Sequence, residues 1–312
     1  MNTVDWLLDS DPALRWQVMR DLADASPAEF EAERARVARE GLGAEILAQQ
    51  EPDGSWHRDS VPAWRSTLFT FLLLRATGAD PREAAVESAI TRLESGLRWN
   101  KLGGGWNLRA AETGGNRFFE GEEEPCINGG VLALGGHFGR PTETLARRLI
   151  GEQLEDGGWN CEAPKSRRSS FHTTICVLEG LLEYERAVGH APEAAAARRK
   201  GEEYLLKRAL FRRLSSGGVV NPEFFKFAFP PRYHYDVLRA LDYLRAAGSP
   251  PDKAVIEGIS LVKSKRQADG RWLLDAAYDG ALAVRVQESV AAPSRWNTLR
   301  ALRVLRWAGE HW

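Results

Sequence analysis

The sequence of 312 residues has few cysteines, almost no net charge and no long apolar run. Its three cysteines, Cys126, Cys161 and Cys176, are too few for a disulfide framework, so we expect thiols or metal ligands. The net charge of −1, from 42 basic and 43 acidic residues, gives no global reason to bind nucleic acid or an anionic membrane. No stretch of about 18 apolar residues is present, which argues against a transmembrane segment.

The first ten residues carry no basic region, and no Pro/Ser-rich linker divides the chain. We therefore expect a cytoplasmic protein that forms a single domain over residues 1–312 and has a local binding site. The oligomeric state is left open.

A short glycine–tryptophan motif recurs along the chain. Its copies are Asp53-Gly54-Ser55-Trp56, Gly104-Gly105-Trp106, Asp156-Gly157-Gly158-Trp159 and Asp269-Gly270-Arg271-Trp272. They lie roughly fifty residues apart, with a double interval before the last, and periods of about 20–50 residues are typical of stacked supersecondary units. Ser216-Gly217-Gly218-Val219 lies in the wide interval, and we interpret it as a degenerate copy without its Trp. The chain is therefore expected to contain five or six copies of one unit.

Between these motifs the apolar residues follow helical spacing, which predicts a nearly all-α protein. One class of helix is rich in Leu, Ala and aromatic residues, tends to begin near Pro and end at Gly, and is predicted to be buried. These inner helices are expected over residues 12–23, 62–77, 125–138, 170–188, 231–247 and 293–308. A charged, Ala-rich class is predicted to face water, over residues 27–50, 81–97, 142–153, 192–210 and 251–267.

Alternating inner and outer helices joined by short turns predict an α/α toroid of about six repeats. In such a double ring all inner helices run in the same direction around a central cavity. An open α-solenoid of the HEAT type uses similar helix pairs and is the alternative, although its repeats are typically shorter.

In two copies of the motif a glutamine also stands four residues before the glycine. The segments Gln50-Glu51-Pro52-Asp53-Gly54-Ser55-Trp56 and Gln153-Leu154-Glu155-Asp156-Gly157-Gly158-Trp159 resemble the Gln-x-x-x-Gly-x-Trp repeat of squalene and oxidosqualene cyclases, and residues 267–272 form a copy one residue shorter. The resemblance covers most of the chain. It implies the α/α toroid of terpenoid cyclases and protein prenyltransferases, as one barrel rather than the two of squalene cyclase.

The repeat also has a physical explanation of its own. Glycine permits the tight turn, Trp packs over it, and Gln hydrogen-bonds a neighbouring helix. We therefore predict structural roles for these Trp and Gln residues.

Inner helices that run in one direction bring their N-terminal ends to one mouth of the ring. These starts are rich in aromatic, basic and titratable residues, and their helix dipoles favour an anion. We predict a substrate-binding set of Trp64, Arg65, Asn128, Phe171, Arg232, Tyr233, Tyr235, Arg295 and Trp296. The acidic run over residues 120–124 opposes an anion there, unless it is solvated or binds a cation. N-capping and packing are the alternative explanation for each residue.

The same helix starts contain the candidate catalytic residues. Asp236 is the acid best placed to act as general acid or base, with His234 or Tyr235 beside it, and His172 opens another inner helix. The Asp-x-Asp-Asp segment with which squalene-type cyclases protonate an alkene is missing, as is an Asp-Asp-x-x-Asp cluster for magnesium and diphosphate. A lone Asp in the first turn is also favoured by the helix dipole alone.

A metal site is a further hypothesis. Cys126, Cys161, His172 and His234 supply the sulfur and nitrogen ligands that zinc prefers. Protein prenyltransferases place an Asp, a Cys and a His at a comparable mouth to hold zinc, although no Asp-x-Cys segment is found here. The alternative is a set of buried thiols and hydrogen-bonded histidines. Cys176 is predicted to be a core thiol, and the other histidines, His57, His137, His190 and His311, are predicted to lie at the surface.

Two functional hypotheses of different classes follow, with substrate and reaction left open. The first is a terpenoid cyclase-like or prenyltransferase-like enzyme that binds an isoprenoid or other apolar molecule in an aromatic cavity, where ring faces stabilise a cation. The second is a non-catalytic ligand-binding or scaffold toroid, which explains the missing acid motifs. A carbohydrate-active or lyase-type barrel is a third possibility, but it calls for two carboxylates across the cavity and the sequence offers Asp236 alone.

Overall fold

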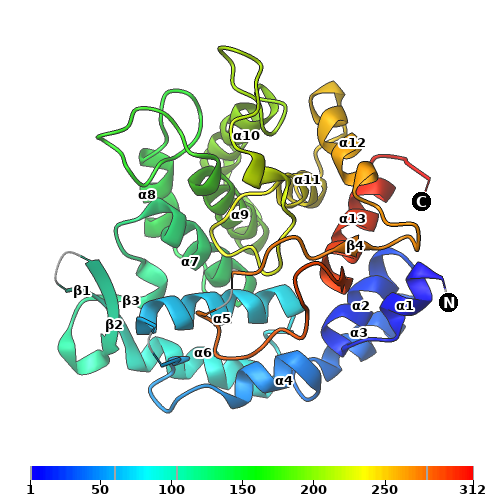
Figure 1. Cartoon of the computed structure of the whole chain (residues 1–312). Coiled ribbons are helices and arrows are strands. Elements are labelled where there is room, and N and C mark those ends of the chain that lie inside the picture. Colours follow the sequence, from blue (N-terminus) through cyan, green and yellow to red (C-terminus); the bar gives the residue numbers. More distant parts are fainter. Residues whose placement is uncertain (1, 60, 103–104, 279, 312) are drawn as a thin grey trace. The chain divides into compact units, whose positions relative to one another are not determined.

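The computed structural model describes residues 2–59, 61–102, 105–278 and 280–311 (Figure 1). The chain divides into two compact units, which we describe separately. Unit 1 comprises Met1–Glu33, Glu202–Tyr278 and Gln287–Trp312, and unit 2 comprises Arg34–Gly201 and Asp279–Val286. The described chain is mostly helical with a few short antiparallel strands. A mostly helical chain is thus confirmed, but the short sheets depart from the nearly all-α prediction. The closed ring and the single domain stay predictions.

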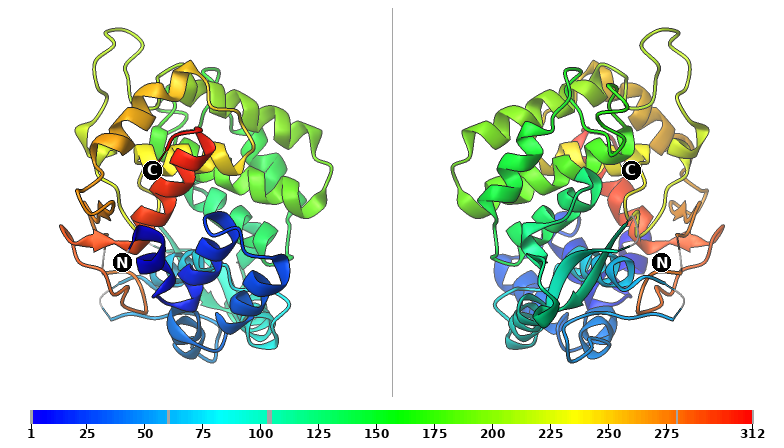
Figure 2. Two further views of the ribbon diagram at one scale, coloured as in Figure 1. Left: turned by 90° about the vertical axis from the view of Figure 1, so that its right-hand side faces the viewer. Right: turned by 90° about the vertical axis from the view of Figure 1, so that its left-hand side faces the viewer.

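Unit 2 contains three of the predicted inner helices, which pack in chain order. Its helices are α4 (Gly41–Ala48), α5 (Ala63–Thr77), α6 (Ala84–Gly96), α7 (Pro125–His137), α8 (Glu143–Gly151) and α9 (Phe171–Val188), and most of α10 (Pro192–Leu206). Helix α5 contacts α7, and α7 lies along α9. These neighbours follow one another through cyan and green in Figure 2.

Unit 1 contains the other three predicted inner helices. Its elements are α1 (Thr3–Leu8), α2 (Pro12–Asp21), most of α3 (Pro27–Arg36), η3 (Pro222–Phe225), α11 (Val237–Ala246), η4 (Lys253–Val255), α12 (Ile256–Ser264), β4 (Trp272–Leu273), β5 (Pro293–Ser294) and α13 (Arg295–Trp307). Helix α13 contacts both α11 and α2, so the first and last predicted inner helices are neighbours. In the described part of the chain, no helix has the length and apolar character needed to cross a membrane.

Three copies of the repeat make the same pair of hydrogen bonds. The indole N–H of Trp56 donates to the carbonyl of Ile46 in the last turn of α4, at 2.7 Å. Its main-chain N–H donates to Thr67 Oγ1 near the start of α5, at 3.1 Å. Trp159 repeats both bonds with Leu149 and Thr174, and Trp272 with Val262 and Thr298. We call this pair of bonds the Trp–Thr clasp, because it ties the last turn of one helix to the first turns of the next.

The glutamine and glycine of the motif hold the neighbouring outer helix. Gln50 Nε2 donates to Gly54 O at 3.0 Å and to Ala89 O of α6 at 2.8 Å. Gln153 makes the same two bonds with Gly157 and with Ala197 of α10. Gly54 has a φ of +88°, and a Cβ there would lie 2.5 Å from the backbone of α6, so only glycine fits. The predicted structural roles of Gln and Trp are confirmed for these copies.

Two copies keep the arrangement with other residues. Arg212 forms the β-bridge with Val219 that Gln50 forms with Trp56, and it donates to Gly217 O at 2.7 Å, which confirms the degenerate copy. At the start of α7, Asn128 bonds both the main-chain N–H and the carbonyl of Glu122, at 2.8 and 3.0 Å. Asn128 thus replaces the threonine of the clasp, and Glu122 stands where the other copies have Trp.

The prediction was wrong for the second copy, which is not a helical turn. The described residues here form a small sheet of β1 (Leu97–Leu102), β2 (Gly105–Ala110) and β3 (Asn116–Arg117), in the order β2-β1-β3. The short helix η1 (Ala111–Thr113) lies between β2 and β3 in the chain, and η2 (Phe118–Glu120) follows β3. Burial alternates along β1, which is the period of a strand. Trp106 is half-buried in β2, and Gly104 lies outside the described residues. Trp99 is the buried indole here, and it donates to Phe118 O at 2.8 Å.

Three predicted helix boundaries also need correction. The helix expected over residues 27–50 is broken between α3 and α4. The helix expected from residue 231 begins at Val237, because Arg232 has a φ of +53°, which no right-handed helix allows, and Asp236 caps the helix. The helix expected from residue 293 begins at Arg295, because Pro293 and Ser294 pair with β4.

The clasp predicts a measurable stability cost. Thr67→Val, Thr174→Val and Thr298→Val keep the side-chain shape but leave a buried Trp N–H without its acceptor, which costs about 1–3 kcal/mol. We expect each variant to lose roughly that much free energy of unfolding in urea denaturation. Thr91→Val on the exposed face of α6 is the matched control, expected within about 0.5 kcal/mol of wild type. Equal stability of Thr174→Val and Thr91→Val would contradict the clasp.

Candidate functional site

Two of the predicted metal ligands come together in unit 2 because α7 and α9 approach each other closely. A Cβ added at Gly129 of α7 would lie 2.4 Å from the carbonyl oxygen of Cys176 in α9, and one at Gly180 would lie 2.5 Å from Gly129 O. Cys126 lies one turn before Gly129, and Thr173 lies one turn before Cys176. The starts of α7 and α9 therefore face each other.

Cys161 reaches the same place through the clasp. It follows Trp159 by two residues, and the Trp159–Thr174 bond fixes that segment against α9. Cys161 Sγ lies 3.4 Å from Thr173 Oγ1, and Cys126 Sγ lies 3.7 Å from Glu124 Oε2. One ligand atom from each of Glu124, Cys126 and Cys161 lies within 4.8 Å of the other two. We call these three residues the thiol–carboxylate cluster.

The two thiols of the cluster differ in proton affinity. The hydrogen bond with Cys126, aided by Thr173, lowers the pKa of Cys161 to about 7. The same bond, with burial, raises the pKa of Cys126 far above its ordinary value. Cys161 is therefore the more nucleophilic sulfur near neutral pH.

Glu122 lies under this cluster as a buried acid. It is 1% exposed, and its Oε1 accepts a hydrogen bond from the main-chain N–H of Glu124 at 2.6 Å. Burial raises the pKa of Glu122 to about 7 despite that bond. The acidic run that the sequence presents is thus divided, since Glu122 is buried while Glu123 and Glu124 are exposed.

The other predicted residues of unit 2 have separate surroundings. Trp64 is half-buried, with Arg65 above its ring at 5.4 Å. Phe171 is buried at the start of α9, and His172 beside it is half-buried. The amide of Asn128 is engaged with Glu122. His172 and His234 are outside the group of close potential ligands, and Glu124 is its third member.

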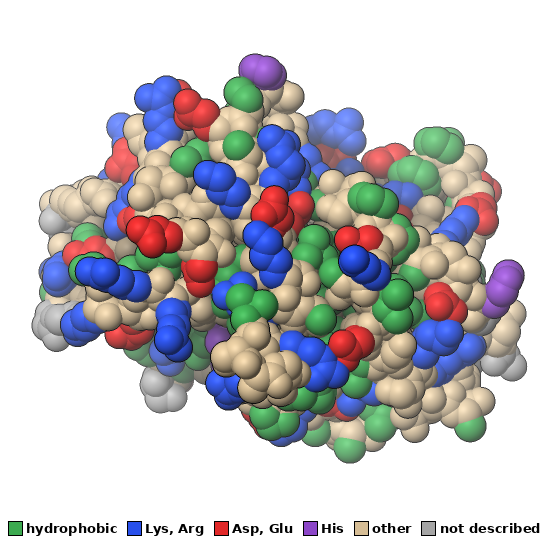
Figure 3. Space-filling view, turned by 90° about the horizontal axis from the view of Figure 1, so that it is seen from above, with side chains coloured by type: hydrophobic (Ala, Val, Ile, Leu, Met, Phe, Trp, Pro, Cys, Tyr) green, Lys and Arg blue, Asp and Glu red, His purple; other side chains and the backbone are tan. Residues whose placement is uncertain are grey.

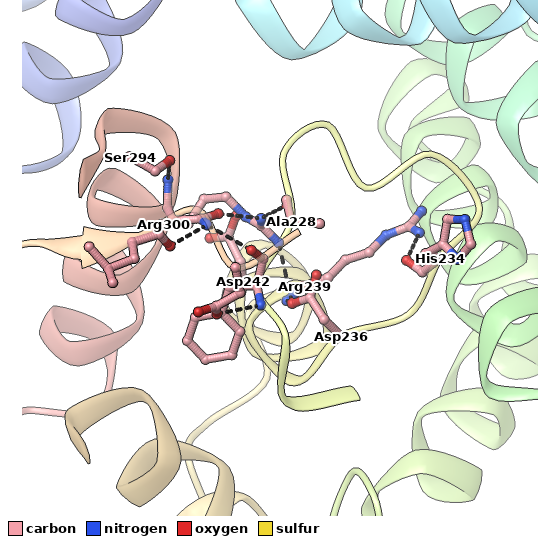
Figure 4. Close-up of polar contacts among 11 residues, drawn as sticks. Ala228, His234, Asp236, Arg239, Asp242, Ser294 and Arg300 are labelled. Atoms are coloured by element: carbon pink, nitrogen blue, oxygen red, sulfur yellow. Dashed lines mark hydrogen bonds and ion pairs between the residues drawn. The ribbon is translucent and has the colours of Figure 1, made fainter. Parts of the chain in front are cut away.

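A second group of predicted residues lies in unit 1 at the start of α11 (Figure 4). Asp236 is the N-cap of α11, 2% exposed, and its Oδ1 accepts from the main-chain N–H of Arg239 at 2.7 Å. Arg300 Nη2 of α13 lies 3.9 Å from the same oxygen. Burial raises the pKa of Asp236 against the lowering effects of Arg300 and of main-chain hydrogen bonds.

Two residues that shortly precede this acid in the chain form an aromatic stack with Tyr278. The ring of His234 is 4.2 Å from that of Tyr233 and 3.6 Å from that of Tyr278, centroid to centroid, and both pairs are close to parallel. Tyr233 is 41% exposed, so one part of the stack is open to solvent. Burial and the charge of Asp236 raise the pKa of Tyr278, which places this phenol within electrostatic reach of the carboxyl.

The predicted inner helices of unit 1 carry buried charges as well as apolar side chains. Arg300 donates to Ala228 O at 3.0 Å and lies 4.0 Å from Asp242 (Figure 4). Arg303 is ion-paired with Asp21 of α2. These contacts hold α13 between α11 and α2, and they account for the burial of both arginines.

Three predicted binding residues of unit 1 are engaged in packing. Tyr235 is buried and donates its hydroxyl to Leu210 O at 2.6 Å. Trp296 is 7% exposed and stacks on Phe229 at 4.3 Å. Arg295 lies over the ring of Trp6 at 4.5 Å. Arg232, the remaining predicted residue here, is half-buried in the turn before α11.

A cavity of about 310 Å³ lies elsewhere in unit 2 and contains none of the predicted site residues. Its walls include Arg98, Arg117, Phe118 and Arg140. Arg140 is paired with Glu87 and Glu94, so much of its charge is neutralised.

On the face shown in Figure 3, the described Lys and Arg side chains are interspersed with Asp and Glu.

Sequence reasoning missed four residues of these groups, Glu122, Glu124, Tyr278 and Arg300. The acidic run was a signal for the first two, because a cation was one of its two explanations. Tyr278 and Arg300 are distant from α11 in sequence, and only the tertiary structure places them there.

Comparison with known proteins adds one likeness. No family model matches the chain, and no curated protein matches it. Among solved structures it is similar to the apo form of the type II terpene cyclase MstE from Scytonema, with 17% sequence identity, coverage of 93% of this chain and 85% of that chain, and a TM-score of 0.46. No residue role or reaction is transferred from this likeness.

One histidine predicted to lie at the surface is largely buried, which corrects that prediction. The side chain of His137 is 19% exposed, with Nε2 3.3 Å from Ala79 O and Nδ1 4.0 Å from the carboxylate of Glu183. Burial, together with the nearby Arg75, lowers the pKa of His137 to about 4. The folded protein therefore favours the neutral ring of His137.

This histidine predicts an acid-dependent loss of stability. The folded pKa of His137 lies below its unfolded value of about 6.5, so its contribution is complete above that pH and is lost as the pH falls toward 4. Between about pH 7 and 4.5 we expect wild type to lose on the order of 1–3 kcal/mol more than His137→Gln, measured by urea denaturation. His190→Gln, at an exposed histidine, should keep the wild-type slope. A wild-type slope in His137→Gln as well would contradict a buried histidine that titrates on unfolding.

Proposed function

We propose that the protein is an enzyme that binds an isoprenoid or similarly apolar molecule and acts on it at the start of α11. Asp236 is the acid or base in this proposal, and the stack of Tyr233, His234 and Tyr278 contacts the ligand.

The observation that carries the proposal is the combination of a buried carboxyl with a raised pKa and a partly exposed aromatic stack beside it. An acid must hold its proton near neutral pH before it can donate it, and burial shifts Asp236 in that direction. Aromatic ring faces attract a cation that develops on an apolar substrate. The carboxyl and the stack together support acid-initiated chemistry on an apolar molecule at the start of α11.

A non-catalytic ligand-binding or scaffold protein is the second candidate, and the hydrogen bonds of Asp236 favour it. As the N-cap of α11 with Arg300 nearby, Asp236 has a structural role that needs no substrate. The two candidates differ in what happens when the charge is removed but the cap is kept.

Asp236→Asn makes that distinction, because asparagine is as good an N-cap as aspartate but cannot donate or accept a proton in catalysis. We expect mass spectrometry to show an apolar ligand that copurifies with the wild type. Alternatively, the wild type converts a compound supplied as a lipid extract, a prenyl diphosphate or squalene. Asp236→Asn should fold, bind the same ligand and lose at least about 100-fold in turnover.

Asp242→Asn is the matched control. Asp242 is also paired with Arg300, but it lies more than one turn after the start of α11 and is not the N-cap. It should lose stability and keep turnover. Wild-type turnover in Asp236→Asn, with ligand binding intact, would favour the non-catalytic candidate. Absence of any bound or converted apolar compound in the wild type would reject the enzyme.

A further inference from the structure

We infer that the thiol–carboxylate cluster of unit 2 is a zinc site in which Glu124, Cys126 and Cys161 are the protein ligands. The inference concerns a different unit from the proposed acid and does not rest on the proposed function. In the sequence-based hypothesis His172 and His234 accompany the two cysteines. Here Glu124 replaces both histidines.

The geometry of the cluster suits a small tetrahedral ion. The three ligand atoms lie within 4.8 Å of one another, and the contact from Cys126 Sγ to Glu124 Oε2 is 3.7 Å. Zinc binds sulfur at about 2.3 Å and carboxylate oxygen at about 2.0–2.2 Å. Neighbouring ligand atoms around a tetrahedral zinc lie farther apart than these bond lengths, at roughly the separations found between the atoms of this cluster. Only small side-chain movements are needed to admit the ion.

The cluster is held in place before any ion binds. Cys126 is fixed by the close approach of α7 and α9 at Gly129, and Cys161 is fixed by the Trp159–Thr174 clasp. The Glu124 main chain is bound by the buried carboxylate of Glu122. Thr173 Oγ1 contacts Cys161 Sγ at 3.4 Å, as a residue that orients a ligand does. A site assembled in this way has little ordering entropy left to lose on binding.

The ligand types select the ion, and their exposure indicates the kind of site. Two sulfurs with one oxygen favour zinc over magnesium or calcium, which prefer all-oxygen sites. Glu124 is exposed and both cysteines are half-buried, so the cluster is open to solvent on one side. Three protein ligands leave the fourth position of a tetrahedral zinc for water or an external thiol or oxygen ligand, which is the pattern of catalytic rather than structural zinc sites.

The test uses the full chain, reduced and stripped of metal with a chelator. Titration with Co²⁺ should give thiolate-to-metal charge-transfer absorption that saturates at one equivalent, and Zn²⁺ should abolish it by displacement. Native mass spectrometry should show one bound zinc. Cys126→Ser and Cys161→Ser should each weaken zinc binding by more than about 100-fold, because loss of a residue that only orients a ligand already costs about 10–100-fold.

Glu124→Gln changes an exposed side chain, so it tests the site without threatening the fold, and we expect it to weaken zinc binding by at least about tenfold. Cys176→Ser in the core and Glu123→Gln on the exposed loop are the controls that should bind zinc as wild type does. Three results would overturn the inference. They are the absence of the charge-transfer band, one-equivalent zinc binding that persists in the Cys126→Ser/Cys161→Ser double variant, and wild-type affinity in Glu124→Gln.

Discussion

The indole N–H of Trp159 donates to α8, and its main-chain N–H donates to Thr174 of α9, so one residue fixes the end of one helix and the start of the next. Trp56 and Trp272 do the same for two other helix pairs. The bonds satisfy a carbonyl that the helix end would otherwise leave without a partner, and they do so where the indole is 0% exposed. Each unit therefore depends on these clasps for the placement of its helix starts.

The candidate sites inherit their geometry from these helix starts. Cys161 follows a clasp Trp, and Thr173, which touches its sulfur, precedes a clasp Thr. Before α7, Asn128 and Glu122 take over the clasp positions. This places an acid in a buried position, and Glu124 and Cys126 follow it closely in the chain. The change of residues in this one copy thus places the buried acid Glu122 close to the carboxylate and thiol of Glu124 and Cys126.

The sequence was most informative about elements and least informative about which helix starts meet. The Gln-x-x-x-Gly-x-Trp copies predicted the helix pairs and the role of Gln50 and Trp56 correctly, since those bonds are local and repeated. The strands over residues 97–117 were missed because a glycine–tryptophan pair there suggested a turn. Part of the polar character of the inner-helix starts, in Thr67, Thr174 and Thr298, is explained by the clasp rather than by a ligand. Tyr278 and Arg300 required the tertiary structure, because nothing in their own sequence context points to Asp236.

Amide hydrogen exchange at Trp56, Trp159 and Trp272 tests most directly the claim that the clasps fix the helix starts. The account predicts that these three main-chain amides exchange only when their unit unfolds, with an opening free energy equal to the one measured by denaturation. Exchange of Trp159 at the rate of an open surface turn, in protein that is otherwise folded, would contradict the clasp and the placement of Cys161 that depends on it.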